Sequence, residues 1–160
     1  MLNKSEIAPV PNSSGTKAGK KIIKNILLVD DDEATNLFNK RVIENSGLAE
    51  KVTVALSGIE ALSFLRTKFI AAGNEPELIL LDAAMPEMDG WKFADEFQKL
   101  SERKKMKTKI IMLTGTPAEI EKIYLKTYPQ ISGYKIKPLT EEMLLDIMHK
   151  FIEENSMEKI

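Results

Sequence analysis

The chain has 160 residues, a formal net charge of −1, 43% hydrophobic residues and 29% charged residues. This composition is that of an ordinary globular protein, and the length suits one domain with a core of its own. The near balance of charge gives no support to nucleic-acid binding. The absence of cysteine excludes disulfides, thiolate metal sites and cysteine nucleophiles, and a single histidine, His149, excludes a cluster of histidine ligands.

The apolar runs of the sequence are short. The longest, ILLV, LILL and IIML, are far too short to cross a membrane. The N-terminus carries no apolar segment typical of a signal peptide. We therefore expect a cytoplasmic protein without a membrane contact.

The N-terminal residues 1–23 are rich in Ser, Gly, Pro and Lys and show no sustained period, which predicts a flexible tail. The structured domain is expected over residues 24–154, followed by a short C-terminal tail, 155–160. We find no internal repeat and no second domain. Within the domain, short apolar runs alternate with amphipathic stretches. The five apolar runs predict strands at Asn25–Val29, Lys51–Ala55, Leu78–Leu81, Lys109–Leu113 and Gly133–Ile136.

Five helices are expected between and after these strands, and helical spacing predicts the faces that four of them bury. The predicted buried stripes are Ala34, Phe38 and Val42; Ala61, Leu65 and Phe69; Phe93, Ala94, Phe97 and Leu100; and Leu144, Ile147, Met148 and Phe151.

Capping residues predict several helix ends. The first helix is expected to stop near Gly47, and the second to open with the capping box Ser57–Glu60. The fourth is expected to start at Thr116, with a proline at its first position and a glutamate completing the box. The five-fold alternation of strand and helix predicts an α/β fold, with a parallel sheet between two layers of helices.

Polar residues follow the predicted strands at their carboxyl ends. Asp30 and Asp31 follow the first strand, and Asp82 follows the third. Thr114 follows the fourth strand and Lys137 the fifth. Because the carboxyl ends of parallel strands meet at one edge of a sheet, these groups are expected to face each other across a small cleft.

Carboxylates packed together repel each other unless a cation joins them. Oxygen ligands without His or Cys indicate a hard divalent ion, Mg²⁺ or Mn²⁺. Asp82, in the middle of the predicted edge, is placed to act as a carboxylate nucleophile and to form an acyl phosphate. The oxygens of a transferring phosphoryl group each need a cation or donor, and Lys137 and Thr114 are the candidates besides the metal.

Four motifs occur in order along this pattern: ILLVDDD at 26–32, LLDAAMPEMDG at 80–90, IIMLTG at 110–115 and GYKIKPL at 133–139. Together they resemble the receiver domain of two-component response regulators, in a stand-alone, chemotaxis-regulator-like form. The resemblance covers residues 24 to 153. It implies a doubly wound, flavodoxin-like sheet of five parallel strands in the order 2-1-3-4-5, with five helices.

The resemblance implies a role for each of the motif residues. It makes Asp82 the phospho-acceptor and gives the metal to Asp30 and Asp31, the latter more directly. It adds the backbone carbonyl of Ala84 as a further metal ligand.

The same resemblance assigns the phosphoryl group to Thr114 and Lys137. It makes Tyr134 an aromatic switch residue that responds to Thr114, and it implies a cis peptide bond between Lys137 and Pro138.

The function implied is that of a single-domain response regulator rather than a turnover enzyme. A sensor histidine kinase or phosphotransfer protein would phosphorylate it, and output would pass to an unknown protein target. The chain ends soon after the last helix, so no further output domain is expected, and a monomer or weak homodimer would suffice. The candidate output surface comprises Ile120, Tyr124, Tyr134 and Lys135.

Plainer interpretations of single residues stay open. Asp30 and Asp31 can cap the helix that follows them, with Asp32 a bystander. Thr114 can serve as a strand-end hydroxyl, and Tyr134 as half-buried packing. His149 is expected to be exposed.

The residues leave three other functions open. One is a receiver that only docks partners without phosphorylation. Another is a metal-dependent phosphatase with an aspartate nucleophile, which Ala84 disfavours because such enzymes usually carry a second aspartate there. The third, a nucleotide-binding flavodoxin-like domain, lacks a Gly-rich loop after the first strand.

Overall fold

The computed structural model describes residues 22–69, 73–115 and 126–159. These form a parallel sheet of five strands in the order β2-β1-β3-β4-β5. The strands are Ile23–Val29 (β1), Ala49–Ala55 (β2), Leu78–Asp82 (β3), Lys109–Thr114 (β4) and Gly133–Ile136 (β5). Each lies where the sequence predicted a strand, and the predicted strand order is confirmed.

The described residues contain four α-helices and one short π-helical segment. They are Glu33–Ser46 (α2), Gly58–Phe64 (α3), Leu65–Phe69 (η3), Gly90–Lys104 (α4) and Glu141–Lys159 (α6). The helix predicted to start at Thr116 lies outside the described residues, as do most of the predicted N-terminal tail and the output candidates Ile120 and Tyr124. Helix α6 continues through most of the stretch predicted as a C-terminal tail, 155–160.

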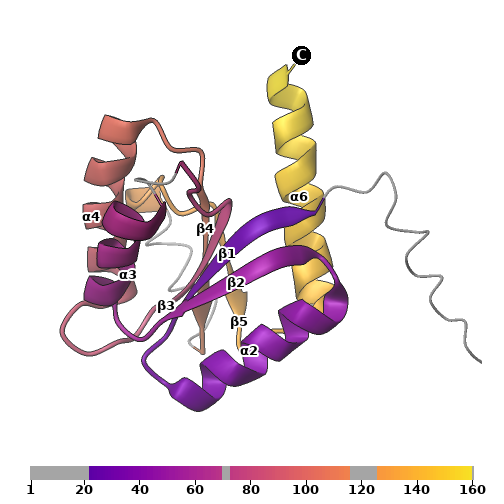
Figure 1. Cartoon of the computed structure of the whole chain (residues 1–160), viewed down its shortest axis with the longest axis horizontal. Helices are drawn as coiled ribbons and strands as arrows, with labels where there is room; N and C mark the ends of the chain where they lie inside the picture. The colour runs from indigo at the N-terminus through magenta and orange to yellow at the C-terminus, as the bar shows by residue number, and fades with distance from the viewer. Residues whose placement is uncertain (1–21, 70–72, 116–125, 160) are drawn as a thin grey trace, which may run out of the picture.

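The helices cover both faces of the sheet, as Figure 1 shows. Helices α3 and α4 lie on one face, and α2 and α6 lie on the other. Successive side chains of a strand point to opposite faces, so each strand serves two cores. In β1, Leu27 and Val29 belong to the core under α3 and α4, while Ile26 and Leu28 belong to the core under α2 and α6.

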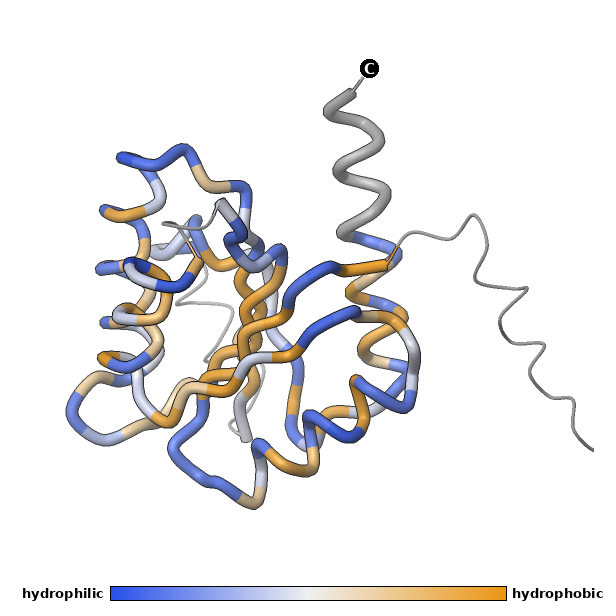
Figure 2. Tube along the Cα trace, viewed as in Figure 1, coloured by the Kyte–Doolittle hydropathy of each residue, from blue (hydrophilic) through white to orange (hydrophobic). Residues whose placement is uncertain are grey.

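Most residues of the inner strands β1, β3 and β4 are apolar, and Figure 2 shows the middle of the sheet mostly in orange, with many blue segments in the surrounding helices and loops. All five residues of β3 are buried. A strand that is buried on both faces is a nearly continuous apolar run. The aspartate at the end of β3, Asp82, therefore lies at the carboxyl edge of the sheet, next to the cores on both faces. Within the described part of the chain, no helix combines the length and apolar character that a bilayer span requires.

Three of the predicted buried stripes are confirmed wherever side chains are described. In α3 with η3 and in α4, every residue of the predicted stripe is buried. In α6, Leu144, Ile147 and Met148 are buried, and the side chain of Phe151 lies outside the described set. His149 is exposed, as expected.

The stripe predicted for α2 is wrong for Ala34 and Phe38, whereas Val42 is half-buried and packs against the core under α2 and α6. The buried residues of α2 are Asn36, Asn39 and Ile43, whereas Phe38 is 50% exposed and Ala34 is exposed. The phase of the helix is set by its first turn, which begins directly after the acidic loop, and this turns two polar asparagines toward the sheet. Apolar periodicity alone misses such a face because it assumes that polar residues point to solvent.

The predicted caps are present. Gly47 ends α2 in the left-handed region, with φ of 71°. Ser57 caps α3 by accepting a hydrogen bond from the backbone N–H of Glu60, 3.0 Å away, and Glu60 Oε1 accepts from the backbone N–H of Leu56 at 2.7 Å. These caps fix the loops that lead from the sheet edge.

Candidate phosphoryl and metal site

The sheet brings the predicted polar residues to one edge. Asp82 is the last residue of β3, and Thr114 is the last of β4. Asp30 follows the end of β1, and Lys137 follows the end of β5. Since β3 pairs with both β1 and β4, Asp82 lies in the middle of this edge.

Three carboxylates converge there. One oxygen each of Asp30, Asp31 and Asp82 lies within 4.8 Å of the others. Asp30 and Asp82 are buried, while Asp31 is exposed, so the cluster opens to solvent on the side of Asp31. An oxygen-only set with one solvent-facing ligand fits Mg²⁺, which keeps several waters when a protein binds it.

Lys137 links two of these carboxylates. Its Nζ lies 3.0 Å from Asp82 Oδ1 and 3.1 Å from Asp30 Oδ2. The backbone N–H of Lys137 also donates to the carbonyl of Thr114 at 2.9 Å, which ties the residue to the end of β4. The Lys137–Pro138 peptide bond is cis, as predicted.

The electrostatics follow from burial and from these contacts. Burial raises the pKa of the Asp82 carboxyl, and the neighbouring Asp30 charge adds to the rise, while the ammonium of Lys137 opposes it. Burial works to lower the pKa of Lys137, but its hydrogen bonds to Asp82 and Asp30 outweigh that effect and raise it. The raised pKa of Lys137 keeps its ammonium charged at neutral pH, beside the two carboxylates.

Thr114 is buried at 2% exposure, at the carboxyl end of β4 beside Asp82. In the parallel sheet, Asp82 pairs with Leu113, and Thr114 pairs with Ile136. These pairings fix the carboxyl end of β4 relative to β3 and β5. The hydroxyl-bearing residue is thus placed at the same edge as the carboxylates, where the sequence predicted it.

The loop between β1 and α2 is fixed by its own acids. Asp32 caps α2: its Oδ2 accepts from the backbone N–H of Thr35 at 2.9 Å. The hydroxyl of Thr35 donates to the same oxygen, and this side-chain hydrogen bond is the main reason that the pKa of Asp32 is lowered, with the bond from the Thr35 backbone N–H adding to it. The capping role that the sequence left open for Asp30 or Asp31 therefore belongs to Asp32. The backbone N–H of Asp32 in turn donates to Asp30 Oδ1 at 2.9 Å.

Gly90 allows α4 to begin against the end of β3. A Cβ at this position would lie 2.7 Å from the backbone oxygen of Asp82 and 3.1 Å from the Cα of Ala83. The N–H of Gly90 donates to the carbonyl of Ala83 at 3.0 Å, and Asp89 caps the helix. These contacts give the reason for glycine at this position.

Two further predicted residues lie near the site. The backbone N–H of Ala84 is 3.4 Å from Asp82 Oδ1, and its side chain is exposed. A role for its carbonyl as a metal ligand stays a prediction. Tyr134, in the middle of β5, is half-buried against the core under α3 and α4.

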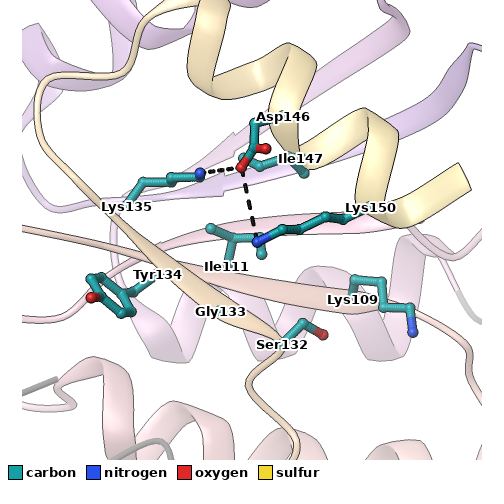
Figure 3. Close-up of a pocket in the computed structure, with 9 residues that line it drawn as sticks. All are labelled: Lys109, Ile111, Ser132, Gly133, Tyr134, Lys135, Asp146, Ile147 and Lys150. Carbon is teal, nitrogen blue, oxygen red and sulfur yellow. Dashed lines mark hydrogen bonds and ion pairs between the residues drawn. The ribbon is translucent and has the colours of Figure 1, made fainter. Parts of the chain in front are cut away.

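Figure 3 shows that Tyr134 points away from α6, while the next residue, Lys135, reaches toward it. Lys135 forms an ion pair with Asp146, whose pKa is lowered first of all by this hydrogen bond. Lys150 lies 4.0 Å from the same carboxylate. The two faces of β5 thus carry different groups: an aromatic ring on the α4 side and a charged cluster on the α6 side.

Sequence reasoning missed Asn36. Its Nδ2 donates to the backbone carbonyl of Asp30 at 2.8 Å, from a buried position in the first turns of α2. The one signal in the sequence is an asparagine close after the acidic loop. It becomes informative only when one knows which face of the helix is buried.

Comparison with known proteins gives a consistent result. The model of the response regulator receiver domain family matches residues 26–149. The probable methanogenesis regulatory protein FilR2 of Methanothrix harundinacea is 28% identical over 120 residues, which cover 74% of this chain and 75% of FilR2. Two other curated relatives match over only 51% and 37% of their own lengths.

Solved structures show the same similarity. A two-component response regulator from Cytophaga hutchinsonii is 27% identical with a TM-score of 0.76, covering 83% of this chain and 99% of that one. The chemotaxis protein CheY4 of Vibrio cholerae is 26% identical with a TM-score of 0.64, covering 81% of this chain and 98% of that one.

Proposed function

The chain belongs to the response regulator receiver domain family, and from that premise we propose that Asp82 accepts a phosphoryl group and thereby switches the contacts that the domain makes with other proteins. Receiver domains are signalling modules that interact with histidine kinases or phosphotransfer proteins. The donor proposed here is the phosphohistidine of such a protein, acting in the cytoplasm.

The observation that carries this proposal is the contact of one ammonium with two buried carboxylates. Lys137 Nζ lies within 3.1 Å of both Asp82 and Asp30, and Asp31 completes the cluster from the solvent side. An ion pair that only stabilises the fold requires one carboxylate for each lysine. Three carboxylates with one lysine leave negative charge that a divalent cation is suited to neutralise.

In the proposed step, a carboxylate oxygen of Asp82 attacks the phosphorus and forms an O–P bond. The P–N bond of the donor phosphohistidine breaks, and the imidazole nitrogen leaves with the electron pair and takes up a proton. Lys137 donates to one phosphoryl oxygen and the Thr114 hydroxyl to another. Asp30, Asp31 and Asp82, with the carbonyl of Ala84, would hold Mg²⁺, which would supply further positive charge at the phosphoryl oxygens.

After transfer, the phosphoryl group draws the Thr114 hydroxyl toward Asp82, and Tyr134 follows into the space beside β4. The output surface is then the part of β5 and α6 around Lys135 and Asp146, shown in Figure 3. Hydrolysis of the acyl phosphate resets the switch, so the domain does not turn over a substrate.

The donor reaches the site over α2. Phe38 is 50% exposed and lines a groove with Lys137 and Pro138, next to the carboxylates. Leu37, on the same helix, is 51% exposed. We place the contact with the phosphohistidine protein on this exposed apolar surface, because apolar side chains beside a phosphoryl site favour protein contact over small-molecule substrates.

The test is intact mass after incubation with acetyl phosphate and Mg²⁺. We expect the wild type to gain one phosphoryl group only when Mg²⁺ is present. Asp82→Asn should gain none, and Asp95→Asn, an exposed acid on α4, should match the wild type. A phosphoryl gain by Asp82→Asn equal to that of the wild type would contradict the proposal.

Failure of the wild type to gain mass needs a second measurement, because rapid hydrolysis has the same effect. Binding of beryllofluoride in the presence of Mg²⁺ separates the two. If neither phosphoryl group nor beryllofluoride binds, the domain docks partners without phosphorylation. Sustained turnover of a phosphomonoester would instead indicate a phosphatase.

A further inference from the structure

Asn36 is a buried amide that contacts the metal-binding loop but none of the reacting groups. It is 3% exposed and lies in α2, one turn after the acidic loop. Its Nδ2 donates to the backbone carbonyl of Asp30 at 2.8 Å. Its Oδ1 is buried and accepts no hydrogen bond from any residue in the described ranges.

The carbonyl of Asp30 lies just beyond the last paired residue of β1. The register of β1 with both neighbouring strands ends at Val29, although the N–H of Asp30 still donates to Ala55 at 3.2 Å. A buried carbonyl outside the ladder needs a donor from elsewhere, and the Asn36 amide provides it. The chain is thereby held at the point where it leaves the sheet.

The side chain of Asp30 is held by other groups. Its Oδ1 accepts from the backbone N–H of Asp32 at 2.9 Å, and its Oδ2 accepts from Lys137 at 3.1 Å. With Asn36 on its carbonyl, both the main chain and the carboxylate of Asp30 are fixed. Asp31 is the next residue, so its position depends on the same turn.

Global stability does not explain an asparagine here. The amide N–H that pairs with the Asp30 carbonyl favours the folded state, whereas the buried Oδ1 without a partner disfavours it, so the two effects largely cancel. Ile43, on the same face of α2, is fully buried and apolar. The effect of the Asn36 amide is therefore local: it orients the loop that carries two carboxylates.

We infer that Asn36 is a positioning residue for the divalent cation, acting through the backbone of Asp30. This inference rests on the proposed function of the site. Residues that orient metal ligands without touching the metal typically change affinity 10- to 100-fold when they are replaced. Asn36 has this relation to Asp30 and Asp31.

The test compares Asn36→Leu with the wild type by calorimetric titration with Mg²⁺ and by urea unfolding without metal. The leucine has a similar size and cannot donate to the Asp30 carbonyl. We expect the Kd for Mg²⁺ to rise roughly tenfold. We expect only a small change in the urea midpoint without metal, because the loss of the donor to the Asp30 carbonyl and the removal of the unpaired Oδ1 have opposite effects.

The matched control is Asn25→Leu. Asn25 is also a buried asparagine, at the opposite end of β1, and its Nδ2 donates to Asn74 Oδ1 at 2.8 Å. This variant should lower the urea midpoint and leave the Kd for Mg²⁺ unchanged. A merely structural role for Asn36 would make the two variants behave alike.

Two results overturn the inference. One is a Kd for Asn36→Leu equal to that of the wild type. The other is measured by NMR on the wild type and therefore applies even if the variant does not fold. It is the finding that the side-chain amide protons of Asn36 exchange with solvent as fast as those of exposed amides. We expect them to be protected and to shift when Mg²⁺ is added. A wild type that binds no Mg²⁺ would contradict the proposed function instead.

Discussion

Lys137 Nζ lies 3.1 Å from Asp30 Oδ2, although 107 positions separate the two residues in the sequence. The contact joins the carboxyl ends of β1 and β5, between which β3 and β4 lie in the sheet. Because the same ammonium lies 3.0 Å from Asp82, it also sets the charge balance of the site.

Replacing Lys137 by methionine removes this cation and leaves two buried carboxylates facing each other. We expect the free energy of unfolding without metal to fall by roughly 1–2 kcal/mol, discounted because the lysine side chain is partly exposed. Urea unfolding with and without Mg²⁺ measures this, and Mg²⁺ should recover part of the loss. Lys135→Met, which breaks a more exposed pair with Asp146, is the control and should cost less. Equal losses in both variants would contradict the account.

Replacing Asp82 by asparagine should stabilise the metal-free protein at neutral pH by on the order of 1 kcal/mol, because it removes a buried charge. The pKa of Asp82 is raised on folding above its ordinary value of 3.8. Its contribution to stability is therefore fully present below that ordinary value and is lost as the pH rises through the folded pKa.

The advantage of Asp82→Asn should accordingly be small near pH 4 and larger near pH 7. Urea unfolding of both proteins across this range, without divalent metal, measures the difference. An advantage that shrinks as the pH rises would show that the sign of the Asp82 shift is wrong.

Replacing Gly90 by alanine puts a Cβ 2.7 Å from the backbone oxygen of Asp82, where neither strand nor helix can yield easily. We expect a loss of roughly 1–3 kcal/mol in the free energy of unfolding, together with slower phosphorylation by acetyl phosphate. Gly115→Ala is the control, because its Cβ would meet nothing within 4 Å. Thermal unfolding that is equally affected in both variants would refute the steric argument.

Replacing the exposed Phe38 by serine should slow phosphoryl transfer from a phosphohistidine protein by roughly tenfold, since exposed aromatic residues often dominate binding. Transfer from acetyl phosphate should not change, because a small donor does not contact α2. The ratio of the two rates, measured by phosphoryl labelling, is the readout. A parallel fall in both rates would place the effect in the site itself.

Replacing Thr114 by alanine should uncouple Tyr134 from the site. In the wild type, beryllofluoride with Mg²⁺ is expected to shift the ring resonances of Tyr134 in NMR spectra. The variant should still bind beryllofluoride but show a much smaller shift at Tyr134. Trp91 lies at the start of α4 and packs against Tyr128, and its ring serves as the reference. A full Tyr134 shift in the variant would exclude Thr114 as the coupling residue.

The sequence by itself determined the sheet and the position of the site. Strands buried on both faces are continuous apolar runs, so β3 and the aspartate at its end are visible without coordinates. Parallel strands share one carboxyl edge, and this alone predicted that Asp30, Asp82, Thr114 and Lys137 meet.

Only the tertiary structure decided which face of α2 is buried and which acid caps it. The capping residue is Asp32, and the helix turns Asn36 and Asn39 inward and Phe38 outward. Apolar periodicity cannot identify a helix face on which a polar side chain is buried because it makes a hydrogen bond. The Asp30 carbonyl needs the donor of Asn36 because the chain leaves the sheet at Asp30, and this is visible only in the folded structure. Likewise, position 90 needs glycine because the backbone oxygen of Asp82, eight positions earlier in the chain, lies close to it. This close contact exists only in the folded protein.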